Sequence, residues 1–251
     1  IYKDVDLVKM PEEEFRERIR WKEISMVFQG AMNALNPVMR ISDQIAEAIL
    51  LHEPDTTKRE ALERAGKLFE LVGIERSRLN NYPHEFSGGM RQRAMIAMAL
   101  ACNPSLIIAD EPTTALDVIV AAQILKLLRE LRKTLNLAMI LISHDLSVIA
   151  ETCEKVIIMY GGQLVETGDV VTIFKEPLHP YTQGLISAFP DVREKSTKLI
   201  SIPGSPPDLL RPPRGCRFHP RCQYAMEICR TTEPRLTKIK GNHYVACHLV
   251  K

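Results

Sequence analysis

The chain has 251 residues, and its 33 Lys and Arg nearly balance 31 Asp and Glu, so the net charge of +2 indicates no particular class of partner. A composition of 45% hydrophobic and 25% charged residues is ordinary for a globular protein, and the length allows one or two domains. No apolar run approaches the roughly 20 residues of a membrane helix, the first residues form no signal peptide, and six cysteines are too sparse for a disulfide scaffold. We therefore expect a reducing, cytoplasmic environment.

Four short β-rich runs predict an α/β core. They cover residues 23–29, 106–109, 137–142 and 156–160. The second and third runs are almost continuously apolar, which is typical of parallel strands covered on both faces. Between them, apolar residues recur at helical spacing over residues 121–135, so strand, helix and strand form a βαβ crossover. We expect a mainly parallel sheet with helices packed against it.

A helix-rich stretch over residues 41–103 separates the first two β-rich runs. One of its predicted helices opens with Thr57 and Glu60, which have the spacing of a capping box, and Gly73 is well placed to end it. A helical insertion of this length between two strands of one sheet predicts a subdomain rather than a loop.

Shifts in composition predict four segments along the chain. After the adjacent Gly161 and Gly162, which predict a hairpin turn, prolines accumulate and cysteines cluster. The predicted segments are a first part of the core over residues 1–30, a helical subdomain over 31–104, a second part of the core over 105–168, and a cysteine-containing C-terminal extension over 169–251.

Polar side chains stand where three of the predicted strands end. Asp110 and Glu111 follow one apolar run, His144 follows the next, and Gln29 ends the first. At the carboxyl ends of parallel strands, where ligands collect, one carboxylate can hold Mg²⁺ beside a phosphate while another activates water. A helix cap or surface turn for the acids, and a solvated histidine, are the alternatives. Pro112, followed by TTALD, favours the phosphate site.

Ser87, Gly88 and Gly89 directly precede an apolar, methionine-rich helical run. A serine and two glycines at the start of a helix offer exposed backbone N–H groups, a hydroxyl and the positive end of a helix dipole. This arrangement predicts an anion-binding site.

Taken together, these motifs resemble those of the nucleotide-binding subunit of ABC transporters. The resemblance is carried by FQ at Phe28–Gln29, FSGGMRQR at Phe86–Arg93, LIIADEPTTALD at Leu106–Asp117 and ISHD at Ile142–Asp145. It spans nearly the whole core and implies a P-loop NTPase-like fold that binds ATP with Mg²⁺. Phe86 and Met90 depart from the commonest signature, LSGGQ, and are similar to the version in peptide importers.

The resemblance implies a role in ATP hydrolysis for each polar residue at the strand ends. Asp110, as the Walker B acid, and Gln29, as the Q-loop residue, would hold Mg²⁺. Glu111 would be the catalytic base that activates water for in-line attack. His144, as the switch histidine, would support the γ-phosphate.

The resemblance also implies a head-to-tail dimer. The signature Ser87, Gly88 and Gly89 would bind the γ-phosphate of the ATP held by the partner, and Asp117 would be the D-loop acid. The second ATPase subunit would be an identical chain or a paralogue.

The phosphate loop GxxxxGK[ST], which the resemblance requires, is not found in the 251 residues. Gly66-Lys67 is the only Gly-Lys pair, lies inside a predicted helix and is followed by Leu68. In the family this loop precedes the Q-loop, so we expect it upstream of Ile1, in a segment that the sequence lacks. A degenerate natural subunit is the alternative. We expect the chain by itself to bind ATP poorly and hydrolyse little.

Four cysteines near the C-terminus, Cys216, Cys222, Cys229 and Cys247, are separated by five, six and seventeen residues. This spacing lacks the CxxC pairs of common zinc sites. It leaves open a four-cysteine [4Fe–4S] cluster, a zinc site that recruits His219 or His248, and four unligated thiols.

The sequence around these cysteines, like residues 177–190 and 202–209, resembles the C-terminal extension of oligopeptide and dipeptide importer ATPases. Some members of that group carry a [4Fe–4S] cluster there, and this favours iron–sulfur over zinc. The extension is also basic, but it has few interleaved aromatics and no known nucleic-acid-binding motif. We expect its arginines to offset thiolate charge, and we expect no nucleic-acid partner.

These observations predict an ATP-hydrolysing subunit that energises import of oligopeptides or dipeptides. Its expected partners are a second ATPase subunit, two membrane permeases and, indirectly, an extracytoplasmic peptide-binding protein. It would be cytoplasmic and peripheral on the inner face of the cell membrane. The alternatives are a soluble ABC-type ATPase acting on nucleic acid or ribosomes, and a metal-binding regulatory subunit with an inactive core.

Overall fold

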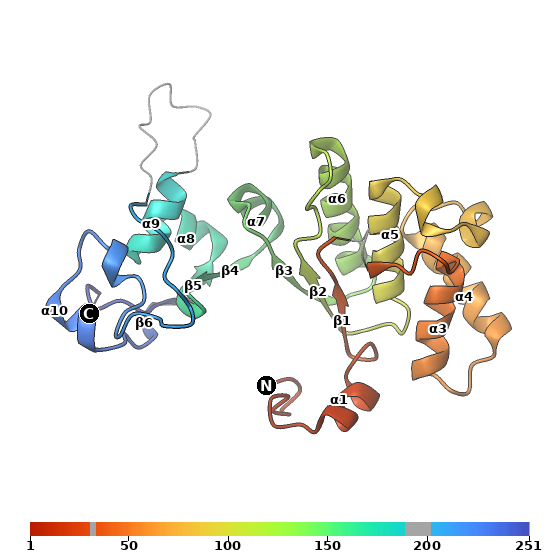
Figure 1. Cartoon of the computed structure of the whole chain (residues 1–251), viewed down its shortest axis with the longest axis horizontal. Helices are drawn as coiled ribbons and strands as arrows, with labels where there is room; N and C mark the ends of the chain where they lie inside the picture. Colours follow the sequence, from red (N-terminus) through yellow and green to blue (C-terminus); the bar gives the residue numbers. More distant parts are fainter. Residues whose placement is uncertain (31–33, 189–201, 251) are drawn as a thin grey trace. The chain divides into compact units, whose positions relative to one another are not determined.

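The structure, a computed structural model, describes residues 1–30, 34–188 and 202–250. It divides into two compact units, Ile1–His144 and Asp145–Lys251, which we describe separately (Figure 1). This division falls earlier in the chain than residue 169, where we predicted the extension to begin. The four predicted segments therefore stay a prediction. Within the described residues, no helix is long and apolar enough to cross a membrane.

Ile1–His144 contains a three-stranded sheet in the order β1-β2-β3. Its strands are β1 (Ile24–Val27), β2 (Leu106–Asp110) and β3 (Ala138–Ile142). Val27 lies opposite Ala109 and Asp110 lies opposite Ile142 in parallel pairing, so the three strands end at the same edge. Between β2 and β3 the chain forms α6 (Val118–Thr134), which confirms the predicted βαβ crossover.

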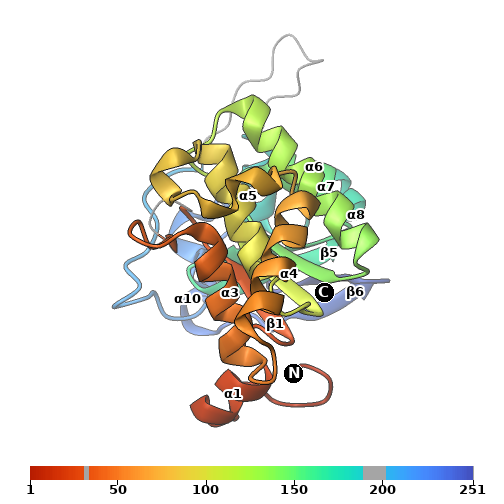
Figure 2. The ribbon, with the colours of Figure 1, turned by 90° about the vertical axis from the view of Figure 1, so that its right-hand side faces the viewer.

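Helices fill the long segment between β1 and β2. They are α3 (Ile41–His52), α4 (Lys58–Leu71) and α5 (Gly88–Ala99), with the 3₁₀ turns η1 (Arg76–Asn80) and η2 (Pro83–Glu85); α1 (Glu12–Arg18) precedes β1. α5 packs against α3, α4, α6 and β1, so it joins the helical layer to the sheet (Figure 2). Phe69, Met95 and Ile96 are fully or almost fully buried there. The predicted helical insertion between two strands is therefore present.

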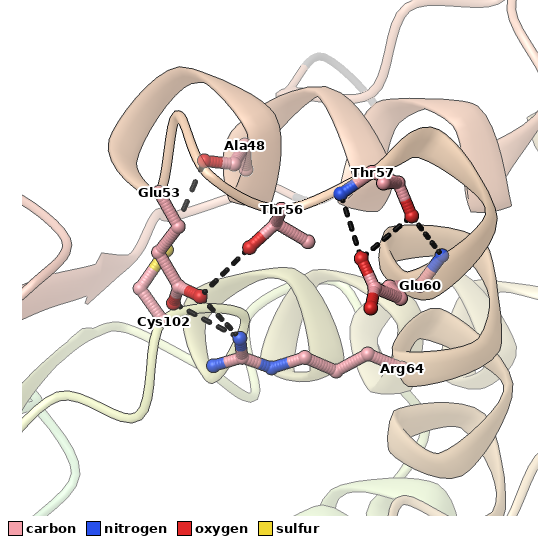
Figure 3. Close-up of polar contacts among 7 residues, drawn as sticks. All are labelled: Ala48, Glu53, Thr56, Thr57, Glu60, Arg64 and Cys102. Atoms are coloured by element: carbon pink, nitrogen blue, oxygen red, sulfur yellow. Dashed lines mark hydrogen bonds and ion pairs between the residues drawn. The ribbon is translucent and has the colours of Figure 1, made fainter.

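Local sequence explains where α4 begins and ends. The backbone N–H of Glu60 donates to the Thr57 hydroxyl, and the Glu60 carboxylate accepts from the Thr57 N–H at 2.8 Å, which confirms the predicted capping box (Figure 3). The chain leaves the helix through Gly73, whose φ of +75° lies in the left-handed region that favours glycine.

An ion pair links α3 to α4 (Figure 3). Arg64 donates through Nη1 to both carboxylate oxygens of Glu53, at 2.9 and 2.8 Å, and both side chains are partly buried. Beside this pair, Cys102 lies with its Sγ 3.8 Å from the Ala48 carbonyl oxygen. Burial raises the pKa of the Cys102 thiol to about 11, so it stays protonated at neutral pH.

Asp145–Lys251 is built on a four-stranded antiparallel sheet in the order β4-β5-β7-β6. Its strands are β4 (Lys155–Tyr160), β5 (Gln163–Asp169), β6 (Thr237–Lys240) and β7 (His243–Val245), and its helices are α7 (Leu146–Thr152), α8 (Val170–Lys175), α9 (Pro180–Ser187) and α10 (Glu227–Thr231), with a 3₁₀ turn η3 (His219–Arg221). Gly161 and Gly162, at φ of +56° and +79°, make the predicted hairpin turn. The fourth predicted strand, β4, therefore pairs antiparallel to β5.

A buried carboxylate joins the extension to this sheet. Glu166 on β5 is fully buried and accepts hydrogen bonds from the backbone N–H groups of Leu178 and His179, at 2.8 and 3.0 Å. Nε2 of His243 on β7 lies 2.7 Å from the same carboxylate. A buried carboxylate is costly unless it is paired and hydrogen-bonded, and here three donors meet that requirement.

Candidate functional site

The C-terminal edge of the parallel sheet gathers the polar side chains expected there. Gln29 lies two residues beyond β1 and is exposed, Asp110 is the last residue of β2, and His144 lies two residues beyond β3. The parallel register brings the ends of β1, β2 and β3 side by side. Glu111 continues the ladder, because its N–H donates to the Ile142 carbonyl at 3.0 Å.

Glu111 is held at both oxygens of its carboxylate. Oε1 lies 2.6 Å from Nδ1 of His144 and accepts from the His144 backbone N–H at 3.2 Å. Oε2 accepts from the Thr114 hydroxyl at 2.8 Å. Because an ionised carboxylate can only accept, Nδ1 of His144 carries the hydrogen of that contact. The Glu111 side chain is 16% exposed, whereas that of His144 is 82% exposed.

A strained turn aims the Glu111 side chain. Glu111 has a φ of +47° and Ala115 has a φ of +62°, values that side-chain-bearing residues rarely adopt. Between them, the Thr114 N–H donates to the Glu111 carbonyl at 3.1 Å. Thr114 thus binds Glu111 twice, through its backbone and through its hydroxyl.

The pKa of Glu111 is lowered from its ordinary value. Partial burial would raise this pKa, but hydrogen bonds from His144 and Thr114 outweigh it by stabilising the ionised form. The carboxylate is therefore ionised at neutral pH and able to accept a proton.

The signature residues form the start of α5. Ser87 is the N-cap, and its hydroxyl oxygen accepts from the Met90 N–H at 3.3 Å. Its side chain is exposed, and Phe86 directly before it is buried against Phe69 with ring centroids 6.2 Å apart. The buried Phe86 anchors the chain, while Ser87 is exposed and the following Gly88 and Gly89 are half-buried.

Asp117 begins the neighbouring helix α6 in the same way. Its carboxylate accepts from the Val120 N–H at 2.9 Å, and its side chain is exposed. Gly88 and Gly89 of α5 face Leu116 and Val120 on either side of Asp117. The structure thus brings the signature and the Asp117 turn together, a contact that the sequence did not predict.

Thr114 is the residue of this region that the sequence analysis missed. Thr114 follows Glu111 by three residues, with Pro112 between them. A hydroxyl at this spacing from an acid favours local hydrogen bonds in turns. That signal does not distinguish a bond to the backbone from a bond to the Glu111 carboxylate.

Three of the four cysteines of the extension have a raised pKa. Burial raises the pKa of Cys216, Cys222 and Cys247, and the charge of neighbouring cysteines raises it further. Backbone N–H groups two residues along the chain, those of Phe218, Tyr224 and Leu249, oppose this rise by hydrogen bonding to the sulfurs. The backbone N–H of Cys216 donates to the Cys229 carbonyl oxygen at 2.9 Å.

The described part of the chain shows no assembled set of metal ligands at these cysteines. Over residues 1–30, 34–188 and 202–250, no group of three or more His, Cys, Asp or Glu is arranged to hold a metal ion. His219 and His248, the histidines of the zinc alternative, each direct a ring nitrogen at a backbone carbonyl oxygen 2.9 Å away. Neither the predicted [4Fe–4S] cluster nor the zinc alternative is supported by the structure.

The fold and the polar strand ends are those of an ATP-binding cassette. The structure is similar to the dimeric post-hydrolysis state of the ATP-binding cassette MJ0796 bound to ADP and Pi, with a TM-score of 0.58 and 27% sequence identity, over 67% of this chain and 71% of that one. The family model "ABC transporter" matches residues 4–114, and the model "Oligopeptide/dipeptide transporter, C-terminal region" matches residues 165–229.

Two relatives are similar over most of the chain. The dipeptide transport ATP-binding protein DppD of Caldanaerobacter subterraneus subsp. tengcongensis is 47% identical over 99% of this chain and 76% of its own length. The oligopeptide transport ATP-binding protein OppD of Escherichia coli strain K12 is 49% identical over 91% of this chain and 68% of its own length. The chain belongs to the oligopeptide and dipeptide transport ATP-binding proteins of the ABC transporters. Neither alternative function has support among these relatives.

Proposed function

We propose that this chain is the ATP-hydrolysing subunit that energises import of oligopeptides or dipeptides. The names of its relatives support the peptide cargo. The observation that carries the catalytic part is the Glu111 carboxylate, which is ionised and held between His144 and Thr114 at the C-terminal edge of a parallel sheet.

Each strand-end residue has a proposed task. Asp110 and Gln29 supply hard oxygen ligands at adjacent strand ends, which are suited to Mg²⁺. Bound Mg²⁺ would neutralise phosphate charge. Glu111 accepts a proton from the attacking water, and the contact between Glu111 and His144 keeps the imidazole beside the reacting phosphate.

The test of this assignment is Glu111→Gln in the assembled transporter. The amide keeps the size of the side chain but cannot take up a proton, so we expect ATP hydrolysis to be abolished while ATP-dependent association of the two ATPase subunits remains. Hydrolysis at the wild-type rate would exclude Glu111 as the base. Loss of association as well would indicate a structural role instead.

Dimerisation completes the proposed site. The exposed N-cap Ser87 and the half-buried Gly88 and Gly89 form a helix start that can bind an anion supplied by another molecule. We propose that this anion is the γ-phosphate of ATP held by a second ATPase subunit, either an identical chain or a paralogue. Asp117, exposed beside these glycines, would face the same subunit.

The remaining partners follow from the proposed cargo. Two membrane permeases would provide the path for the peptide, and an extracytoplasmic peptide-binding protein would deliver it to them. The chain would then be cytoplasmic and attached to the inner face of the membrane through the permeases. Co-purification with two permeases would test this, and their absence from a membrane-extracted complex would contradict it.

The iron–sulfur part of the proposal depends on the cysteines alone. Backbone N–H groups at three of the four sulfurs partly offset the rise in pKa that burial causes, and thiolates are the ligands of [4Fe–4S] clusters. The test is iron and acid-labile sulfide in protein purified without oxygen, compared with Cys216→Ser and Cys222→Ser variants. Equal iron in wild type and variants would refute a cluster at this site.

A further inference from the structure

The start of α5 and the start of α6 meet closely at two glycines. A Cβ added at Gly89 would lie 2.6 Å from Cγ1 of Val120, a separation far below van der Waals contact. A Cβ added one residue earlier, at Gly88, would lie 3.5 Å from Cδ2 of Leu116, which is an ordinary contact. Of these two glycines, only Gly89 therefore lacks room for a side chain because of its neighbours in the same chain.

Backbone conformation does not explain glycine at position 89. Gly89 is the second residue of α5 and is absent from the glycines with positive φ, so an alanine could adopt its conformation. Alanine is moreover the better helix former. The reason for glycine must therefore be either the close contact with Val120 or the approach of a ligand to the Gly89 backbone.

Val120 cannot easily move away. It is the third residue of α6, and a β-branched side chain in a helix has one strongly preferred rotamer. Its own N–H is held by the Asp117 carboxylate at 2.9 Å. A side chain at position 89 would therefore push on the first turn of α6 and displace Asp117 with it.

We propose that Val120 is a positioning residue, which fixes the distance between the signature at Ser87–Gly89 and the turn at Asp117 by resting on Gly89. This inference rests on the proposed function, in which both segments face the second ATPase subunit. Ser87 and Asp117 are both exposed, so their spacing would set how the two groups meet that partner. Glycine at position 89 is then a consequence of the contact with Val120.

A double-mutant cycle in the assembled transporter tests the contact. We expect Gly89→Ala to reduce ATP turnover by about tenfold or more and Val120→Ala by about threefold, while the double variant recovers to the turnover of Val120→Ala. Recovery occurs because the smaller side chain at 120 makes room for the new methyl group. A double variant as inactive as Gly89→Ala would overturn the proposal, since glycine would then be required by a ligand.

A second measurement does not depend on ATP hydrolysis. In amide NMR spectra of the purified chain, Gly89→Ala should shift the resonances of Asp117 and Val120, and the added Val120→Ala should reverse much of that shift. Gly88→Ala is the matched control for these spectra, and it should leave the Val120 resonance nearly unchanged. Unchanged Asp117 and Val120 resonances in Gly89→Ala would contradict the contact.

The two measurements separate this inference from the proposed function. A wild-type transporter that hydrolyses no ATP would refute the proposed function, while the spectra would still decide whether Val120 positions Asp117. If Gly89→Ala fails to fold, the double variant remains decisive, because the proposal requires it to fold. An unfolded double variant would overturn the proposal.

Discussion

The carboxylate of Glu111 and the imidazole of His144 lie 2.6 Å apart, although 32 residues separate them in the chain. This contact exists because β2 and β3 are parallel neighbours whose ends meet at one edge of the sheet. The strained turn after β2 then directs Glu111 towards His144 rather than into solvent. Topology brings the two residues to the same edge, and the local turn brings their side chains into contact.

The Thr114 hydroxyl should help to keep Glu111 ionised. In Thr114→Val the hydrogen bond to Oε2 is lost while the shape is nearly kept, so we expect the pKa of Glu111 to rise from its lowered value. The measurement is a carbon-detected NMR titration of the Glu111 carboxyl group.

Thr114→Ser is the control for this titration, because serine keeps the hydroxyl. We expect its Glu111 pKa to stay near that of the wild type. In the assembled transporter, the acidic limb of the turnover profile should move to higher pH in Thr114→Val but not in Thr114→Ser. Identical Glu111 titrations in all three proteins would show that the hydroxyl has no such effect.

Arg64 should contribute modestly to the stability of the helical layer. A single guanidinium nitrogen of Arg64, Nη1, contacts both carboxylate oxygens of Glu53, and the two side chains are 25% and 33% exposed, so solvent screens the attraction. We expect Arg64→Met, which removes the charge but keeps much of the apolar stem, to lower the free energy of unfolding by about 0.5–1 kcal/mol. Urea denaturation measures this, with Arg59→Met on the exposed side of α4 as the control. An equal loss in both variants would indicate that the Glu53 pair contributes nothing specific.

The sequence predicted those features that depend on short stretches of chain or on regular topology. The Thr57 capping box needs only four consecutive residues, and the strand-end positions of Asp110 and His144 follow from parallel strands. The hydrogen bond from Thr114 depends on positive φ values at Glu111 and Ala115 that no residue type there requires. It could not be predicted for that reason.

Long-range pairing limited the prediction in the second unit. Glu166 and His243 are 77 residues apart, and nothing local indicates that their side chains meet in a buried contact. The spacing of the cysteines likewise left their chemistry open, because ligand geometry depends on how the intervening chain folds. The contact between Gly89 and Val120 was missed for the same reason, since it depends on how two helices pack.

The pair formed by Glu166 and His243 should be a main source of stability in Asp145–Lys251. His243→Ala removes one of the three donors to a fully buried carboxylate, so we expect the free energy of unfolding of this unit to fall by about 3 kcal/mol. The loss of unfolding free energy is measured by chemical denaturation, with amide hydrogen exchange in β5 and β7 as the readout.

His248→Ala is the matched control, since His248 bonds the Thr232 carbonyl at the surface of the same extension. We expect it to cost about 1 kcal/mol or less. Equal stability of the His243→Ala and His248→Ala variants would contradict a stabilising role of the buried contact between Glu166 and His243.

His179 should make the second unit less stable in mild acid. Burial lowers the pKa of His179 to about 4, while in the unfolded chain it returns to its ordinary value of 6.5. The unfolded state therefore binds a proton first as the pH falls. The stability that neutral His179 contributes is fully present above pH 6.5 and is lost progressively between 6.5 and about 4. At about 1.4 kcal/mol per pKa unit, the full loss is about 3 kcal/mol.

His179→Asn tests this pH dependence, because asparagine is a good N-cap for α9 and does not titrate. Urea unfolding of both proteins should be compared at pH 7 and at pH 5. Ordinary carboxylates stay ionised over this interval, and they are the same in both proteins. We expect the wild type to lose more stability than the variant over this interval, whatever their absolute stabilities. Parallel pH profiles would contradict a neutral, buried His179, and a steeper profile in the variant would contradict the sign of the shift.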